Sequence, residues 1–343
     1  MGCLLPVHLG YAAAVDPAVA SLTHETRGVL IWHVHGSWMD SFVAGRHRYV
    51  VPASATQPQQ ARGLLGRHWS NAVEVPTSRL RDEDIDLVVL QRPEEFELAE
   101  RWLGRRLGHD VPAVYVEHNA PRPFAVDSVH PVADRRDIPL IHVTEFNELM
   151  WDNETAPTMV INHGIADPGR LYTGEIPAAA AMINEPLRRW RTVGADLLGD
   201  LAAHRPIDVW GIDTLALNDR HPNGLVRGRG DVPPPQLWRE VARRRLYLHT
   251  ARWTSLGLSL VEAMFLGMPI VAVATTMASL VVPTEAGVVS ANPKTLAYAL
   301  ERFATDFAEA SAAGKAARDF AVANFSLDRF LTQWDEVIHG HCR

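Results

Sequence analysis

The stretch WTSLGLSLVEAMFLGMPIV, residues 253–271, decides the fold because both ends of one helix can be read from it. Ser255 can accept a hydrogen bond at the start of a helix that runs from about Gly257, and Gly267 stands where a left-handed residue ends such a helix. Pro269 follows two residues later, before a run of apolar residues. The stretch predicts a helix over 257–266 that leads directly into a buried strand.

The start of this helix also predicts an anion site. Free backbone amides and the helix dipole at such a position favour a phosphate. Glu262 lies about one turn inside the helix, and its side chain leans back toward the helix start. Its carboxylate can accept hydrogen bonds from the two hydroxyls of a ribose, or it can bond a neighbouring loop amide in a structural role. The residues expected around the phosphate are Thr254, Ser255, Leu256, Gly257 and Leu258.

Outward from this helix, short apolar strands alternate with amphipathic helices along the chain. In the first half we expect strands at 28–35, 47–53, 85–91, 111–117, 138–144 and 158–162, and helices at 58–70, 94–107 and 145–151. In the second half we expect strands at 179–184, 207–212, 224–228, 245–250, 269–274 and 286–290, and helices at 191–204, 234–244, 257–266, 294–305 and 308–323. This alternation predicts an α/β protein with two doubly wound, Rossmann-like parallel-sheet domains that face each other across a cleft.

The glycines and prolines of 164–176 indicate the junction between the two halves. We expect an N-terminal domain over 1–165 and a C-terminal domain over 166–325. We also expect a C-terminal helix over 326–343. The sequence does not decide whether this helix packs against the N-terminal domain. Because ligands of open α/β sheets bind at the carboxyl ends of the strands, the cleft is the expected functional site.

Charge and lysine content exclude several classes of function. The net charge of −7 argues against a nucleic-acid partner. Of 33 basic residues only Lys294 and Lys315 are lysines, so the chain has no phosphate-binding loop that ends in lysine and no suitable lysine for pyridoxal phosphate. Any anion site must therefore use arginine and backbone amides.

Metal, disulfide and membrane signals are weak. The cysteines Cys3 and Cys342 cannot form a disulfide framework or a paired-cysteine metal site. Asp82 and Asp84 precede a strand rather than end one, which indicates a solvated strand entrance and no metal. Without an apolar run of about 18 residues or a basic signal sequence, we expect a cytoplasmic protein with no integral membrane segment.

Glu262 followed by AMFLGMPIVA resembles the retaining glycosyltransferases of the GT-B fold, family 4, also called group 1. The resemblance implies transfer of a sugar from a nucleoside diphosphate sugar, with retention and without metal or other cofactor. It leaves the acceptor open as a small molecule, a glycan or a lipid-linked molecule. Family members have a second glutamate where this chain has Thr254. If the site is active, Thr254 predicts a donor sugar that is modified or deoxygenated on that edge.

The same resemblance implies further site residues. His118, at the end of strand 111–117, would contact the donor sugar near the reacting carbon; capping of that strand is the alternative. Gly36, with Ser37, would let the first loop approach the ligand. Arg189 and Arg191 would bind phosphates, with Arg188 nearby and Asn184 in the place of a family arginine, although an exposed basic helix start is also compatible with the pattern.

Three histidines have mainly structural interpretations. His33 and His35 are expected to share one strand face and to be buried with satisfied ring nitrogens. His163, with Gly164, is expected to pack at the hinge. Residues 228–233, GRGDVP, lack the third glycine of a dinucleotide fingerprint and are expected to border the nucleotide base.

The runner-up function belongs to another class. Because Thr254 and Asn184 replace two charged residues of the family pattern, a catalytically silent nucleotide-sugar-binding protein, or a partner subunit on the same fold, is the alternative.

Overall fold

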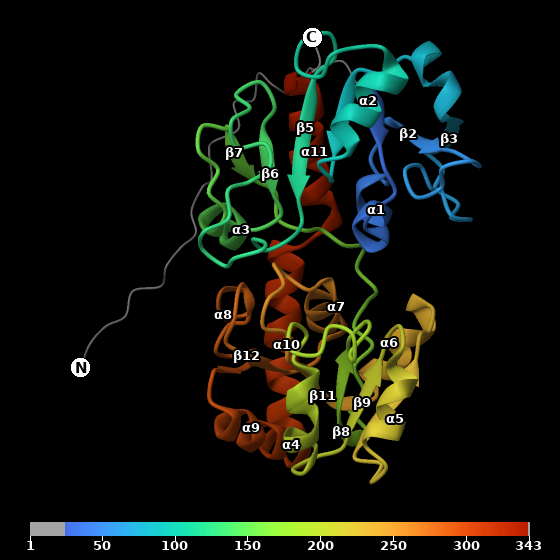
Figure 1. Cartoon of the computed structure of the whole chain (residues 1–343). Coiled ribbons are helices and arrows are strands. Elements are labelled where there is room, and N and C mark those ends of the chain that lie inside the picture. Colours follow the sequence, from blue (N-terminus) through green and yellow to red (C-terminus); the bar gives the residue numbers. More distant parts are fainter. Residues whose placement is uncertain (1–24, 342–343) are drawn as a thin grey trace.

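The computed structural model describes residues 25–341, and it consists of two lobes that are each built on a parallel sheet (Figure 1). The first sheet has seven strands in the order β3-β2-β1-β4-β5-β6-β7, and the second has six in the order β10-β9-β8-β11-β12-β13. Both orders follow the 3-2-1-4-5-6 pattern of doubly wound nucleotide-binding domains. The predicted fold class, two Rossmann-like domains, is confirmed.

The N-terminal lobe alternates strands with short helices. Its strands are β1 Gly28–Ile31, β2 Arg48–Ala53, β3 Ala72–Pro76, β4 Leu87–Leu90, β5 Ala113–Glu117, β6 Leu140–His142 and β7 Thr158–Val160. Its helices are α1 Gly36–Phe42, η2 Thr77–Asp82, α2 Glu95–Leu103 and α3 Glu145–Met150, with α11 Leu327–His341 added from the end of the chain.

The C-terminal lobe repeats the plan. Its strands are β8 Ile176–Met182, β9 Ile207–Trp210, β10 Val226–Gly230, β11 Arg244–His249, β12 Ile270–Val273 and β13 Gly287–Ser290. Its helices are η3 Ala195–Leu197, α4 Leu198–Ala202, η4 Thr214–Ala216, α5 Leu217–Arg220, α6 Pro234–Ala242, α7 Leu258–Leu266, α8 Ala278–Val281, α9 Pro293–Thr305 and α10 Phe307–Asn324.

Each sheet is buried on both faces. Along β1, Val29 and Ile31 belong to one apolar cluster while Leu30 belongs to the cluster on the opposite face. In β8, Ala179 and Ala180 divide between two clusters in the same way. Successive side chains of a strand point to opposite faces, so continuous apolar strands are expected when helices cover both.

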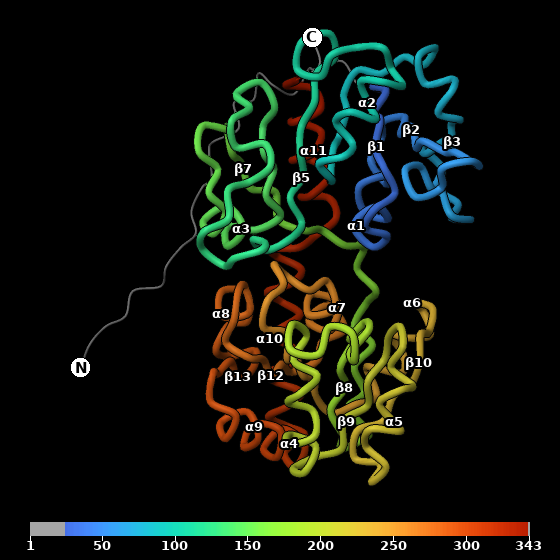
Figure 2. The backbone as a smooth tube through the Cα atoms, viewed as in Figure 1, coloured from blue at the N-terminus to red at the C-terminus, as the bar shows by residue number. Residues whose placement is uncertain are grey.

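The last helix returns to the N-terminal lobe (Figures 1 and 2). Phe330 and Trp334 of α11 are buried in the same cluster as the α1 side chains Trp38 and Phe42. The two chain crossings between the lobes run side by side, because Ile165 and Ser326 form a parallel bridge. Gly164 is required there, since a Cβ at this position would lie 2.2 Å from the Phe330 Cβ.

Some predicted elements differ from the structure. No helix forms over 58–70, because Gly63, Leu65 and Gly66 all adopt positive φ values. The first helix is instead α1, directly after the first strand. The edge strand β3 was not expected, and the helix predicted at 191–204 is reduced to η3 and α4.

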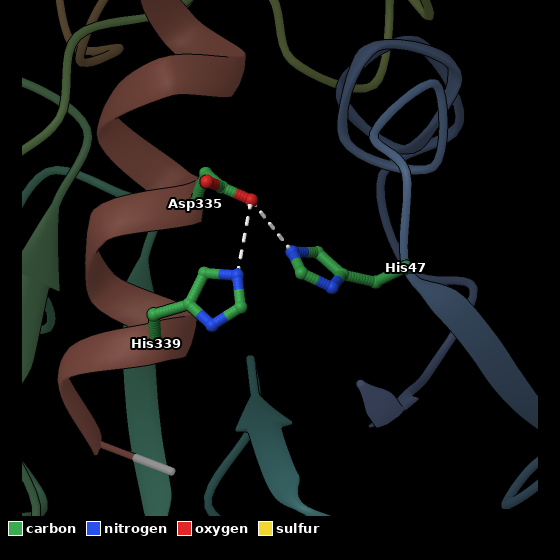
Figure 3. A group of neighbouring side chains, drawn as sticks. All are labelled: His47, Asp335 and His339. Carbon is green, nitrogen blue, oxygen red and sulfur yellow. Dashed lines mark hydrogen bonds and ion pairs between the residues drawn. The ribbon is translucent and has the colours of Figure 1, made fainter. Parts of the chain in front are cut away.

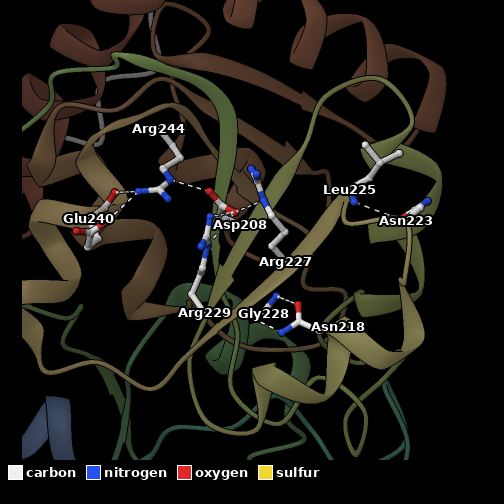
Figure 4. Close-up of polar contacts among 9 residues, drawn as sticks. All are labelled: Asp208, Asn218, Asn223, Leu225, Arg227, Gly228, Arg229, Glu240 and Arg244. Carbon is white, nitrogen blue, oxygen red and sulfur yellow. Dashed lines mark hydrogen bonds and ion pairs between the residues drawn. The ribbon is translucent and has the colours of Figure 1, made fainter.

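A buried carboxylate ties three strands of the second sheet together (Figure 4). Asp208 of β9 has no exposed surface and receives ion pairs from Arg227 at 2.7 Å, Arg229 at 2.9 Å and Arg244 at 2.8 Å. Arg244 also pairs with Glu240 of α6 at 3.1 Å. A buried charge needs such partners, so this cluster fixes β9, β10 and β11 relative to one another.

The expectations about Cys3 and Cys342, and about the sequence before residue 25, fall outside the described residues. Within 25–341, no helix has both the length and the apolar character needed to cross a membrane.

Candidate functional site

A cleft of about 1440 Å³ lies where the carboxyl edges of the two sheets face each other. In a doubly wound sheet, the strand order reverses between its two central strands, and ligands bind at that point. Here the reversal falls between β1 and β4 and between β8 and β11. The cleft is lined by residues that follow these strands or their neighbours: His35, Gly36, Ser37, Asn119, Ile183, Asn184, His249 and Thr250.

The start of α7 opens on this cleft. Gly257 is its N-cap residue and supplies no side-chain cap, and Gly257, Leu258 and Ser259 all line the cleft. The first amides of the helix are therefore available to an anion. At the other end Gly267 has φ +86°, which confirms the predicted left-handed ending.

The predicted cap, Ser255, is wrong. Its hydroxyl lies 2.7 Å from the Thr144 hydroxyl of the N-terminal lobe, so it links the two lobes instead of capping α7. Leu256 is buried in the apolar core. Neither residue lines the cleft, because the chain turns inward before the helix begins.

Glu262 lines the cleft one turn inside α7. Burial raises the pKa of its carboxyl to about 7, an effect partly countered by the Trp238 indole. The carboxyl forms no ion pair with any described residue. A half-buried carboxyl without a cation is available to hydroxyl donors of a ligand.

The three arginines of 188–191 have different surroundings. Arg188 lines the cleft, but its Nε donates to the Glu185 Oε1 at 2.7 Å. Arg191 does not line the cleft and pairs with Asp196 at 2.8 Å, so its predicted phosphate contact is not supported. Arg189 lines the cleft, and among residues 25–341 it has no carboxylate partner. Burial, followed by the charge of Arg188, lowers the pKa of Arg189.

His118 lies just behind the cleft surface. Its Nε2 is 3.0 Å from the Gln91 Oε1, and the Gln91 amide nitrogen donates to the Trp32 carbonyl at 2.7 Å, which fixes the orientation of the amide. The His118 Nε2 therefore carries the proton and Nδ1 is an acceptor. Burial holds the pKa of His118 well below its usual value, so the ring is neutral. Its ring packs on His35, with centroids 4.2 Å apart.

His35, rather than His118, reaches the cleft. The expectation that His33 and His35 share a strand face is wrong, because β1 ends at Ile31 and both histidines lie in the following loop. His33 packs on Trp69, and its Nδ1 has no partner among the described residues. His163 is buried at the hinge, where burial lowers its pKa to about 4.

Gly36 and Ser37 line the cleft as predicted, but the space at Gly36 is taken by a side chain. A Cβ there would lie 2.9 Å from the Arg67 guanidinium. Asn184 also lines the cleft, and its side-chain oxygen accepts from the Ile212 amide at 3.0 Å, so it fixes a loop. The Thr254 hydroxyl is buried in the cleft wall without a hydrogen-bond partner among the described residues.

One group of described side chains has the composition of a metal site: His47, Asp335 and His339 (Figure 3). Its surroundings do not fit a cation. The Arg46 guanidinium pairs with Asp335 at 2.7 Å and lies 2.9 Å from the His339 Nε2. The His47 Nδ1 accepts from the Arg27 amide at 3.2 Å, so its Nε2 carries the proton that points at Asp335. These contacts attach α11 to the N-terminal lobe.

The structure tests one of two predictions about polar segments, and the other, that residues 228–233 border the nucleotide base, stays a prediction. Asp82 and Asp84 are exposed at the start of β4, away from the carboxyl edge, which confirms the solvated strand entrance. Asp231, Val232 and Pro233 line the cleft between β10 and α6, on the same side as Trp210 and Gly211.

Sequence reasoning missed two cleft contacts. Arg122 lines the cleft, and the Trp253 Nε1 donates to the Pro121 carbonyl of the other lobe at 3.2 Å. Gln91, which orients His118, was also missed. The proline-rich segment NAPRPF after strand 111–117 was the only signal, because prolines mark a loop but do not reveal its partner.

Solved structures with the same architecture share little sequence with this chain. HepE from Anabaena, solved in complex with UDP, has a TM-score of 0.69 at 17% identity, with 92% of this chain and 100% of HepE covered. Sucrose-phosphate synthase from Thermosynechococcus elongatus has a TM-score of 0.68 at 14% identity, with 92% and 98% covered. TarM from S. aureus has a TM-score of 0.60 at 16% identity. There 74% of this chain is covered, and the chain spans 55% of the length of TarM.

The C-terminal lobe carries a family pattern of its own. Residues 222–320, which include α6, α7 and most of α10, match the family model described as Glycosyl transferases group 1. The two lobes have the GT-B fold, and the C-terminal lobe resembles the group 1 glycosyltransferases. No curated protein matches the chain. The matched segment supplies part of the C-terminal wall of the cleft, including the start of α7 and Glu262.

Proposed function

We propose that the protein transfers a sugar from a uridine diphosphate sugar to an acceptor hydroxyl, with retention of anomeric configuration and without a metal ion. The observation that carries this proposal is the C-terminal wall of the cleft. An unpaired arginine, Arg189, an uncapped helix start at Gly257 and the carboxyl of Glu262 lie on that one wall. These groups suit a diphosphate followed by a ribose.

The choice of uridine rests on similarity. HepE has been solved with UDP and with UDP-glucose, and the pneumococcal O-GlcNAc transferase GtfA with UDP and GlcNAc. In the present chain the base would lie between the loop after β9 and the start of α6, where Gly211 and Val232 line the cleft. Glu262 would then accept from the two ribose hydroxyls, and Arg189 with the α7 amides would bind the diphosphate.

The reaction follows from these positions. The bond between the anomeric carbon and the phosphate oxygen breaks, and Arg189 and the helix amides stabilise the charge that develops on the leaving diphosphate. The acceptor hydroxyl attacks from the same face and gives its proton to that phosphate oxygen, which gives retention. His118 remains neutral and packs on His35, which lines the cleft and would be the ring that contacts a sugar hydroxyl.

We propose that the reaction needs no metal ion because the candidate metal ligands, two aspartates and one histidine-containing group, lie away from the cleft. Asp82 and Asp84 lie at the far end of their strand from the cleft. The His47, Asp335 and His339 group is occupied by Arg46, and His47 precedes β2 at the amino edge of the sheet. The acceptor would enter from the N-terminal wall, and its class, small molecule, glycan or lipid-linked, is left open.

Calorimetry and product analysis test this function together. We expect UDP to bind and ADP to bind more weakly, and a ligand at 100 times its Kd to add about 2.7 kcal/mol to stability. Release of UDP from a UDP-sugar in excess EDTA, with product retention shown by anomeric NMR coupling, would support the full proposal. Inversion or manganese-dependent turnover would contradict it.

A catalytically silent binder is the alternative, and the unpartnered Thr254 hydroxyl in the place of a family acid is the observation that favours it. Such a protein would bind UDP-sugar intact. UDP would not be released in the presence of any acceptor, although UDP affinity would remain normal.

A further inference from the structure

The segment after β5 brings a piece of the N-terminal lobe onto the donor side of the cleft. Asn119, Pro121 and Arg122 all line the cleft. The Trp253 indole, directly before the α7 loop, donates to the Pro121 carbonyl at 3.2 Å. Arg122 is therefore carried on a loop that is bonded to the opposite lobe beside the proposed phosphate site.

Among the described residues four arginines line the cleft, and they form two groups according to whether a carboxylate neutralises them. Arg67 donates to both oxygens of Asp40 at 2.7 Å, and Arg188 pairs with Glu185. Arg122 donates a hydrogen bond to the neutral Asn119 side chain at 2.6 Å and forms no ion pair with a residue of 25–341. Within residues 25–341, Arg122 and Arg189 are the two cleft arginines without a carboxylate, and they come from different lobes.

These two guanidinium groups are within electrostatic reach of each other. After burial and Arg188, the charge of Arg122 also lowers the pKa of Arg189. Burial lowers the pKa of His35, and Arg122 contributes to that shift as well. Arg122 is thus within electrostatic range of both His35, at the start of α1, and Arg189. Like charges in a cleft repel, and an anion between them relieves the repulsion.

The chain holds Arg122 in place through a series of polar contacts. The Asn119 amide nitrogen and side-chain nitrogen both donate to the Glu117 Oε1, at 2.6 and 3.2 Å. The other Glu117 oxygen accepts from the His130 Nε2 at 3.1 Å, and both residues are buried. The hydrogen bond from Arg122 to Asn119 restricts this exposed side chain and so reduces the conformational entropy that it loses when it binds an anion.

We propose that Arg122 is a second diphosphate ligand, supplied by the N-terminal lobe opposite Arg189. This inference rests on the proposed function, because it assumes that the anion is the diphosphate of the donor. Neither Lys294 nor Lys315 lines the cleft, so the second cation at this site is an arginine. Diphosphate binding would then bridge the lobes and hold the cleft closed.

Calorimetry with UDP and uridine on Arg122→Gln tests the inference. We expect UDP affinity to fall about tenfold or more, as for one lost charged hydrogen bond, and uridine affinity to stay within twofold. Arg67→Gln is the matched control, since it removes another N-terminal cleft arginine that Asp40 already neutralises. Its UDP affinity should not change. Wild-type UDP affinity in Arg122→Gln would overturn the inference.

Two further measurements distinguish a direct contact between Arg122 and the diphosphate from a folding defect and from an independent effect. Arg122→Lys keeps the charge and should recover part of the UDP affinity, which a folding defect at this exposed position would not allow. The losses of Arg122→Gln and Arg189→Gln should not add in the double variant, because both residues bind one anion. Strict additivity, or an effect of Arg122→Gln on the acceptor KM alone, would overturn the shared site.

Different results would contradict the proposed function and this inference. If the wild-type protein binds no nucleoside diphosphate, the proposed function is wrong. If Arg189→Gln weakens UDP binding and Arg122→Gln does not, only the assignment of Arg122 is wrong.

Discussion

The two walls of the cleft differ in how their polar groups are paired. On the N-terminal wall, Arg67 is bound to Asp40, and His118 to Gln91. On the C-terminal wall, Arg189 and the Thr254 hydroxyl have no partner among the described residues, and Glu262 has no cation. Buried polar groups normally have partners, so the unpartnered groups of the C-terminal wall are available to a ligand.

This difference explains why the sequence of only one wall matches a family model. The family model matches 222–320 and none of the N-terminal lobe. A ligand-binding wall needs particular groups at particular places, such as Glu262 one turn inside α7. On the N-terminal wall Arg67 has a carboxylate partner, whereas Arg122 has none among residues 25–341.

The largest expected effect is on the stability of the N-terminal lobe, which we expect to change without loss of nucleoside binding by the C-terminal lobe. Trp334→Ala removes a ring that packs on Phe42, with centroids 4.8 Å apart, in the core of the N-terminal lobe. We expect the free energy of unfolding of that lobe to fall by about 3–5 kcal/mol, measured in urea. Glu336→Ala, on the exposed side of the same helix, is the control. Uridine affinity should survive in native buffer; its loss would show that the lobes are not independent.

The next effect concerns the unpaired cation of the C-terminal wall. Arg189→Met should weaken UDP binding about 10- to 100-fold and leave uridine binding unchanged, because a charged hydrogen bond is worth about 1.5–3 kcal/mol. Arg188→Met, which removes a residue already paired with Glu185, should change UDP affinity much less. Equal losses for UDP and uridine would indicate an indirect effect. Isothermal titration calorimetry provides both affinities.

The carboxyl of Glu262 should make nucleoside binding depend on pH. Burial raises its pKa from 4.5 to about 7, and ribose hydroxyls bind the ionised form, so uridine affinity should rise between pH 6 and 8. Glu262→Gln should bind uridine about tenfold more weakly and without this pH dependence. Uridine carries no phosphate, so phosphate titration does not contribute. An unchanged pH profile in the variant would contradict the ribose contact.

The same group has a consequence for the free protein. The folded state holds the Glu262 proton up to about pH 7, whereas the unfolded chain releases it near 4.5, so this group lowers stability as pH rises between those values. Glu262→Gln should remove that contribution in urea unfolding at pH 5 and 7.5.

The smallest effect is expected at Thr254. Thr254→Val removes a hydroxyl that has no partner in the described chain, and should reduce affinity for a UDP-sugar about fivefold, equivalent to ~1 kcal/mol, while UDP affinity stays constant. Thr254→Ser, which keeps the hydroxyl, serves as the control. Equal losses for UDP and the UDP-sugar would place Thr254 away from the sugar.

Much of the fold was predictable because its signals are local. The strand β12 and the helix α7 with its glycine ending follow from apolar runs and one left-handed position within about twenty residues. The helix predicted at 58–70 does not form, and the reason is also local. Gly63 and Gly66 adopt positive φ values, which interrupt the helical pattern of the residues around them.

The candidate site was predictable only in part. Glu262 and the α7 start lie on one continuous segment, so sequence alone placed them together. The partner of Ser255 is Thr144, 111 residues earlier, and no local pattern shows that the two hydroxyls meet. The choice among Arg188, Arg189 and Arg191 was equally hidden, because it depends on which carboxylates lie nearby.

The sequence by itself therefore determined the two doubly wound domains, the helix that opens on the cleft and the group 1 pattern, since propensity, periodicity and capping act within a few turns of chain. The tertiary structure alone decided which polar groups remain unpaired, that α11 completes the N-terminal core, and that Arg122 and Arg189 line one cleft from different lobes. Hydrogen bonds and ion pairs act over a few ångströms of space, and residues that are distant in sequence come within that range only when the sheets are assembled.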